Sequence, residues 1–140
     1  MDPIQIDRSS WPLVVFTVPE FLSPDSIDLH FDNLKSEVFP RGRYASVMDC
    51  RLTQADQFDA RLRSYAATRY EEHKAIFADL LISETYVLPS PFQRGVMTAI
   101  RWLAPAPWPT KNFARFGEAV VWSKDQIEQE RASNAPSATV

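Results

Sequence analysis

Cysteine, glycine and histidine are scarce in this chain, and each shortage excludes a class of site. Cys50 is the single cysteine in 140 residues, so the chain has no internal disulfide. His30 and His73 are 43 positions apart and have no second cysteine to complete a metal-ligand pattern. None of the three glycines belongs to a nucleotide-binding pattern. We therefore expect no metal, no nucleotide and no other cofactor.

A basic excess and long apolar runs are also missing. The 15 Lys and Arg against 18 Asp and Glu give a net charge of -3, which argues against a nucleic-acid partner because many phosphates would need neutralising. No stretch reaches the length of a membrane span. The first ten residues lack the basic start and apolar run of a signal peptide. We expect a cytoplasmic protein.

The composition is that of one globular domain, with 45% hydrophobic and 24% charged residues. A chain of this length buries roughly two-thirds of its unfolded surface, enough for one core. We expect an N-terminal extension at 1–9, an α/β domain at 10–127 and a polar, disordered tail at 128–140.

Strand and helix signals alternate along the domain. Short apolar or β-branched runs predict strands at 13–18, 44–49, 85–88 and 112–116. Apolar residues spaced by three and four predict helices at 24–39, 56–79 and 91–104, and a last helix from 117. In the first helix the stripe consists of Ile27, Phe31, Leu34 and Val38. This order predicts an α/β sandwich with an about four-stranded, mixed or largely parallel sheet and about four helices.

The helix at 91–104 carries the residue types that are most typical of a binding surface. Its apolar stripe, expected to face the core, is Phe92, Val96, Ile100 and Leu103. The opposite side is expected to form an outward partner-binding patch of Arg94, Met97, Thr98 and Arg101, flanked by Trp102 or Trp108. Arginine, methionine and tryptophan are common in protein interfaces. The alternative is a solvated helix with Trp108 folded over the edge of the core.

A second candidate site lies at the end of the strand at 44–49. Asp49, Cys50 and Arg51 occupy the position where α/β folds place function. A catalytic cysteine needs a base and an electropositive site, whereas a lone cysteine also serves as a small packing residue. Both interpretations of Cys50 stay open from the sequence.

Several segments carry a family resemblance. They are Leu88-Pro89, Phe92, Arg94-Gly95, Thr98-Ala99, Ile100, Trp102-Leu103, Pro105, Pro107, Pro109, Phe113-Ala114, Glu118-Ala119 and Trp122, together with Tyr44 to Asp49 and Arg51. Over about residues 10 to 127 they resemble bacterial STAS/SpoIIAA-like proteins. The resemblance implies a STAS-like α/β fold and a non-enzymatic module that switches protein partners. Relatives in the wider superfamily resemble CRAL-TRIO lipid carriers.

The chain departs from that family at one functional motif. Anti-sigma factor antagonists carry a phosphorylatable Asp-Ser-Gly-type turn, whereas this chain continues from Asp49 as Asp-Cys-Arg-Leu-Thr-Gln. The usual phosphoswitch motif is therefore absent. Thr53 is the nearest hydroxyl, and its alternative role is that of a turn or cap residue.

Three functional hypotheses follow from the sequence. The first is a cytoplasmic regulatory or adaptor domain that binds another protein through the patch on the helix at 91–104. The second is a binder of a small apolar ligand or lipid, suggested by 9 Phe, 4 Trp and 4 Tyr and by the lipid-binding relatives. The third is an enzyme that uses Cys50. The sequence identifies neither the partner nor the oligomeric state.

Overall fold

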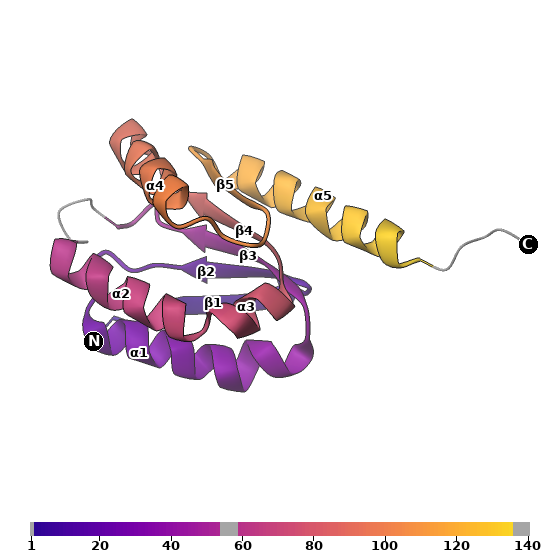
Figure 1. Ribbon diagram of the computed structural model, residues 1–140, viewed down its shortest axis with the longest axis horizontal. Coiled ribbons are helices and arrows are strands. Elements are labelled where there is room, and N and C mark those ends of the chain that lie inside the picture. Colours follow the sequence, from indigo (N-terminus) through magenta and orange to yellow (C-terminus); the bar gives the residue numbers. More distant parts are fainter. Residues whose placement is uncertain (1, 54–58, 136–140) are drawn as a thin grey trace, which may run out of the picture.

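A mixed β-sheet forms the centre of the protein. The computed structural model describes residues 2–53 and 59–135. Within these residues the sheet has five strands in the order β1-β2-β3-β4-β5 (Figure 1). The strands are β1 (Gln5–Ser10), β2 (Leu13–Thr17), β3 (Tyr44–Asp49), β4 (Leu81–Val87) and β5 (Thr110–Phe113). β1 is antiparallel to β2, and β2 to β5 are parallel neighbours. The general α/β class is confirmed, with one strand more than predicted.

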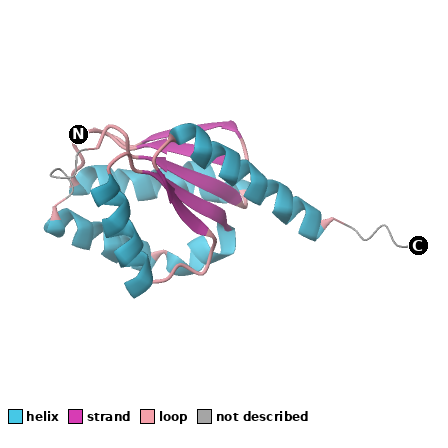
Figure 2. Ribbon diagram, turned by 90° about the horizontal axis from the view of Figure 1, so that it is seen from above, coloured by secondary structure: helices cyan, strands magenta, loops and turns pink. Residues whose placement is uncertain are grey.

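Helices cover both faces of the sheet (Figure 2). They are α1 (Pro24–Asn33), a π-helix η1 (Leu34–Val38), a 3-10 helix η2 (Phe39–Arg41), α2 (Ala60–Glu72), α3 (Lys74–Leu80), α4 (Pro91–Leu103) and α5 (Phe116–Asn134). One hydrophobic cluster joins α1, α2 and α3 to one face, and a second cluster joins α5 to the other. No helix among the described residues has the length and apolar character needed to cross a membrane.

The first helix forms as its sequence predicts. Ser23 accepts a hydrogen bond from the backbone N–H of Ser26 at 3.2 Å, and Pro24 occupies the first turn. The predicted stripe of Ile27, Phe31, Leu34 and Val38 is buried. Continuation as a π-helix keeps the last two stripe residues against the sheet until Gly42, whose positive φ of 99° ends the segment. The stripe prediction is confirmed.

The helix predicted over 56–79 is divided into α2 and α3. The break is at His73, whose φ of -108° and ψ of 7° leave the helical region. The His73 ring nitrogen Nδ1 lies 2.7 Å from the carbonyl oxygen of Arg69, which fixes the ring at the break. The predicted start of this helix, including Phe58, lies outside the described residues, as does the side chain of Leu103.

Both ends of the domain hold more structure than expected. Residues 5–9, predicted to belong to an N-terminal extension, are part of β1, which pairs with β2 from Gln5 to Ser10. At the other end α5 continues to Asn134, so the predicted disorder from 128 is wrong for 128–134. The rest of the predicted tail, 136–140, lies outside the described residues.

The two faces of the sheet carry different side chains. The face toward α1, α2 and α3 is rich in aromatic residues, among them Phe16, Phe31, Tyr44, Phe77 and Trp108. The face toward α5 packs smaller residues such as Ala45, Val47, Val87, Ala119 and Ile127. The alternation of side chains along each strand produces this division. The aromatic face contains the candidate site.

Candidate functional site

A pocket of about 370 Å³ lies between α1, α2 and α4 over the aromatic face of the sheet. Val18, Met48 and Tyr86 line it at the carboxyl ends of β2, β3 and β4. Open α/β sheets bind their ligands at this end of parallel strands. This volume lies in the size range of small-molecule sites.

The pocket wall is mostly apolar. Its apolar lining residues come from every surrounding element: Ile4, Val18, Leu22, Ile27, Phe31, Met48, Ala66, Ala67, Leu88, Phe92, Val96, Met97, Ile100, Ala104, Pro105 and Ala106. Phe92 is 72% exposed and Ile100 is 39% exposed. The stripe residues Phe92, Val96 and Ile100 therefore border the pocket and solvent instead of packing into the core, and the prediction of a core-facing stripe is wrong for these three.

Behind the lining, Glu84 of β4 is a carboxylate that is only 2% exposed. Arg101 Nη2 lies 2.5 Å from Glu84 Oε1 and 3.3 Å from the phenol oxygen of Tyr86. Trp108 Nε1 donates to the same Glu84 oxygen at 3.4 Å. Burial raises the pKa of the Glu84 carboxyl, while the positive charge of Arg101 opposes that rise. Because its neighbours all donate hydrogen bonds to it, we assign Glu84 as an ionised partner of Arg101.

Two tyrosines extend this polar cluster into the pocket. The phenols of Tyr70, on α2, and Tyr86 interact electrostatically with each other and with Glu84. Burial raises the pKa of both phenols, and the negative charge of Glu84 raises them further. Both tyrosines are therefore neutral at physiological pH. The cluster of Tyr70, Glu84, Tyr86, Arg101 and Trp108, here called the floor cluster, joins α2, β4, α4 and the segment that precedes β5.

His30 supplies a separate polar group to the pocket wall. The residue is 4% exposed, and its Nδ1 atom has no hydrogen-bond partner among the described residues. Burial lowers the pKa of the imidazole to about 4, so it is neutral at physiological pH. Its ring meets Phe16 and Phe31 edge to face, at centroid distances of 5.1 Å and 5.7 Å. A neutral imidazole among aromatic rings can form one hydrogen bond with an occupant of the pocket.

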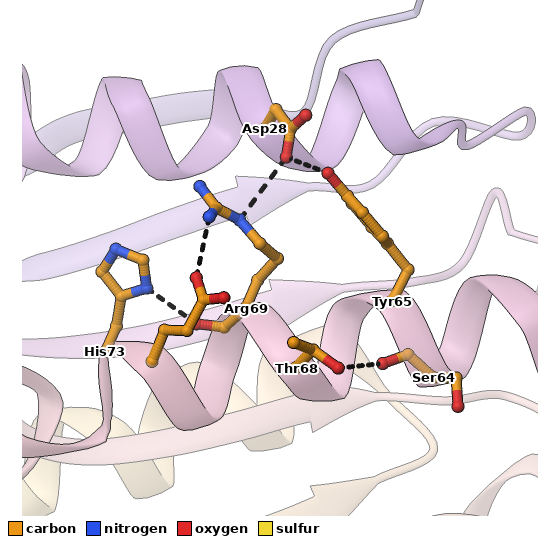
Figure 3. Close-up of polar contacts among 7 residues, drawn as sticks. Asp28, Ser64, Tyr65, Thr68, Arg69 and His73 are labelled. Atoms are coloured by element: carbon orange, nitrogen blue, oxygen red, sulfur yellow. Dashed lines mark hydrogen bonds and ion pairs between the residues drawn. The ribbon is translucent and has the colours of Figure 1, made fainter.

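A polar network fixes α1 against α2 and so fixes one wall of the pocket (Figure 3). The Tyr65 hydroxyl donates to Asp28 Oδ1 at 2.5 Å. Arg69 forms ion pairs with Asp28 at 3.4 Å and with Glu72 at 2.8 Å. Its guanidinium also lies over the ring of Phe31, 5.5 Å from the centroid. Charged groups at the surface thus cover the aromatic residues beneath them.

The residues predicted to form an outward patch on α4 are divided between inside and outside. Arg101 points inward to Glu84, and Trp108 is only 8% exposed. Arg94 turns back to the carbonyl oxygens of Leu88 and Pro89, at 2.7 Å and 2.9 Å. Thr98 is exposed and donates to the carbonyl of Arg94, while Met97 lines the pocket. The prediction of one outward patch is wrong, because a buried carboxylate on β4 draws Arg101 inward.

The second predicted site is also divided. Arg51 pairs with Asp49 through Nη2 at 2.8 Å, and its guanidinium stacks on Phe116. Cys50 faces the other way and lines the pocket. Burial, followed by the charge of Asp49, raises the pKa of its thiol to about 12. Among the described residues, no group of three or more His, Cys, Asp or Glu side chains is arranged to hold a metal ion.

The structure brings Cys50, Met97, Arg101 and Trp108 to one pocket and leaves Asp49, Arg51, Arg94 and Thr98 outside its lining. Sequence reasoning missed His30, Tyr70, Glu84 and Tyr86 as site residues. One signal for Glu84 was present: it interrupts a strand of apolar and hydroxyl residues, and a carboxylate in a buried strand requires a cation from elsewhere. His30 gave no signal beyond its position near the predicted stripe.

Comparisons of the chain with protein-family models, with curated proteins and with solved structures found no match. The resemblance to STAS/SpoIIAA-like proteins therefore stays a prediction.

Proposed function

We propose that this protein binds a small apolar molecule in the pocket between α1, α2 and α4. The observation that carries the proposal is the pocket itself, about 370 Å³ in volume, with a mostly apolar wall and a few polar groups at its floor. This combination is typical of small-molecule sites.

The position of α4 supports an apolar occupant. Phe92 and Ile100 line the pocket yet are 72% and 39% exposed. Apolar surface left in contact with water is unfavourable, and contiguous exposed apolar patches mark interaction sites. A bound molecule that contacts both side chains would remove part of this surface from water.

Binding without chemical turnover is part of the proposal. Among the described residues that line the pocket, Cys50 supplies the thiol, and its raised pKa disfavours the reactive thiolate. The buried carboxylate, Glu84, is occupied by Arg101 and Trp108. These contacts support a binding role over an enzyme that uses Cys50.

The proposal is tested by filling the pocket. Val96→Trp places a large side chain in the lining, and Val121→Trp makes the same change at a 70% exposed position on α5. We expect the fluorescent apolar probe N-phenylnaphthylamine to bind the wild type and the Val121 variant and to lose at least about tenfold in affinity for the Val96 variant. Equal affinity of all three proteins, or no binding by the wild type, would reject the pocket as the site.

A regulatory adaptor role is the second candidate, favoured by Trp102 on α4. Its indole is 82% exposed, and exposed tryptophans are frequent anchors of protein interfaces. The resemblance to STAS/SpoIIAA-like proteins is consistent with a cytoplasmic partner-binding domain of this kind. A pull-down that captures a protein with the wild type and not with Trp102→Ser would support it. Capture that is the same with both proteins would exclude Trp102 as the contact.

A further inference from the structure

The charges at the pocket floor are already balanced. Arg101 and Glu84 form an ion pair at 2.5 Å, with the carboxylate 2% and the guanidinium side chain 23% exposed. His30 is neutral, and the two tyrosines are neutral. An ionised group placed against this floor would lose its hydration without gaining an unpaired opposite charge.

The pocket still offers hydrogen-bonding atoms without partners, although its buried charges neutralise each other. Arg101 Nε is buried and has no hydrogen-bond partner among the described residues. His30 Nδ1, on α1, is also buried and has no hydrogen-bond partner among the described residues. Both residues line the pocket. A buried polar atom without a partner is unfavourable, and an occupant that supplies the missing partner removes that cost.

From these contacts we infer that the pocket selects an uncharged apolar molecule with a hydrogen-bond acceptor, such as a carbonyl group, over anionic and cationic molecules of the same length. The inference rests on the proposed function and adds the class of ligand. The acceptor lies toward Arg101 Nε, and the apolar part contacts the aromatic and aliphatic wall. A carboxylate or an ammonium group is disfavoured because it would lose its hydration beside a pair, Glu84 and Arg101, whose charges already neutralise each other.

The rim of the pocket does not override this selection. Arg63, Glu71 and Lys74 line the rim from α2 and α3, and all three are exposed to solvent. Exposed charges are screened by water and salt, so their effect on a ligand is small compared with that of a buried pair. The buried pair therefore determines the selection.

The test compares three straight-chain ligands of matched length: methyl nonyl ketone, undecanoate and undecylamine. Each displaces N-phenylnaphthylamine from the wild-type protein at pH 7.5 and physiological salt. We expect the ketone to displace the probe at a concentration at least about tenfold lower than either charged ligand. Undecanoate or undecylamine that displaces as well as the ketone would overturn the inference and leave the proposed function in place. Failure of the probe itself to bind would instead reject the proposed function.

A charge variant provides the second arm. Glu84→Gln removes the counter-charge of Arg101, and undecanoate should then gain about tenfold in affinity relative to the wild type. Glu130→Gln is the matched control, because Glu130 pairs with Arg43 and does not line the pocket. It should leave the order of the three ligands unchanged. An undecanoate affinity that is the same in a folded Glu84 variant as in the wild type would overturn the inference, and if this variant does not fold, the wild-type series decides alone.

Discussion

Arg101 of α4 and Glu84 of β4 are 17 positions apart in sequence and form an ion pair at 2.5 Å beneath the pocket. The pair ties the amphipathic helix α4 to an interior strand of the sheet. It also determines which charge a ligand meets there. This ion pair explains why α4, which the sequence predicts to carry an outward-facing patch, directs Arg101 inward.

Loss of one partner of this pair should be more harmful than loss of both. Arg101→Met leaves the carboxylate of Glu84 buried without its cation, and we expect a loss of about 3 kcal/mol in the free energy of unfolding. The double variant Glu84→Leu with Arg101→Met should recover at least half of that loss, because no charge stays buried. Urea denaturation of the three proteins measures the difference. A double variant less stable than the single one would show that the unpaired carboxylate of Glu84 is not the source of the loss.

His30 should make stability depend on pH. Its pKa is about 4 in the folded protein and near 6.5 when unfolded, so the unfolded chain binds the extra proton between these values. The contribution is present above pH 6.5 and is lost as the pH falls toward 4, to a total of about 3 kcal/mol. His30→Phe should remove this dependence. The difference in unfolding free energy between variant and wild type at several pH values isolates the histidine, and a constant difference would contradict the prediction.

Truncation of apolar residues should distinguish the core from the pocket border. Phe31 is 1% exposed, and Phe31→Ala should cost about 3 to 5 kcal/mol. Ile100 is 39% exposed, and Ile100→Ala should cost less than about 1 kcal/mol while weakening the binding of N-phenylnaphthylamine. Thermal unfolding measures the change in stability, and probe titration measures the change in binding. A cost for Ile100→Ala as large as that for Phe31→Ala would place α4 in the core.

Cys50 should alkylate slowly in the folded protein. A rise of its pKa from 9.0 to about 12 lowers the thiolate fraction at pH 8 by about a thousandfold. Mass spectrometry of the iodoacetamide reaction, with and without denaturant, gives the two rates. Rapid alkylation of the folded protein would return the cysteine-enzyme hypothesis to consideration.

Local sequence patterns predicted several of the helices and strands. The stripe of the first helix, from Ile27 to Val38, was recoverable because packing against a sheet requires that spacing. The strand at 44–49 was recoverable because it is buried throughout. The sequence did not predict β1 because few apolar residues alternate there. Pairing with β2 stabilises a strand that the intrinsic propensity of these residues does not favour.

The site was harder to predict because its contacts are not local. Arg101 and Trp108 were chosen as surface residues, yet both donate to Glu84. A helical stripe shows which residues share a face and does not show whether that face meets a packed core or a cavity. The error on Phe92 and Ile100 has this origin. His30 and Tyr70 enter the site only through the packing of α1 and α2 on the sheet.

The two faces of the sheet differ in how much the size of a side chain can change. On one face, α5 packs aliphatic residues such as Ala119 and Ile127 into a buried cluster, so the volume of a side chain there limits which substitutions are tolerated. On the aromatic face, Phe92, Val96 and Ile100 of α4 line a cavity, so these side chains can change in size without displacing a packed core residue. A library of variants restricted to these three positions should therefore yield altered ligand preference in folded proteins, whereas the same library on the buried side of α5 should mostly yield unfolded ones.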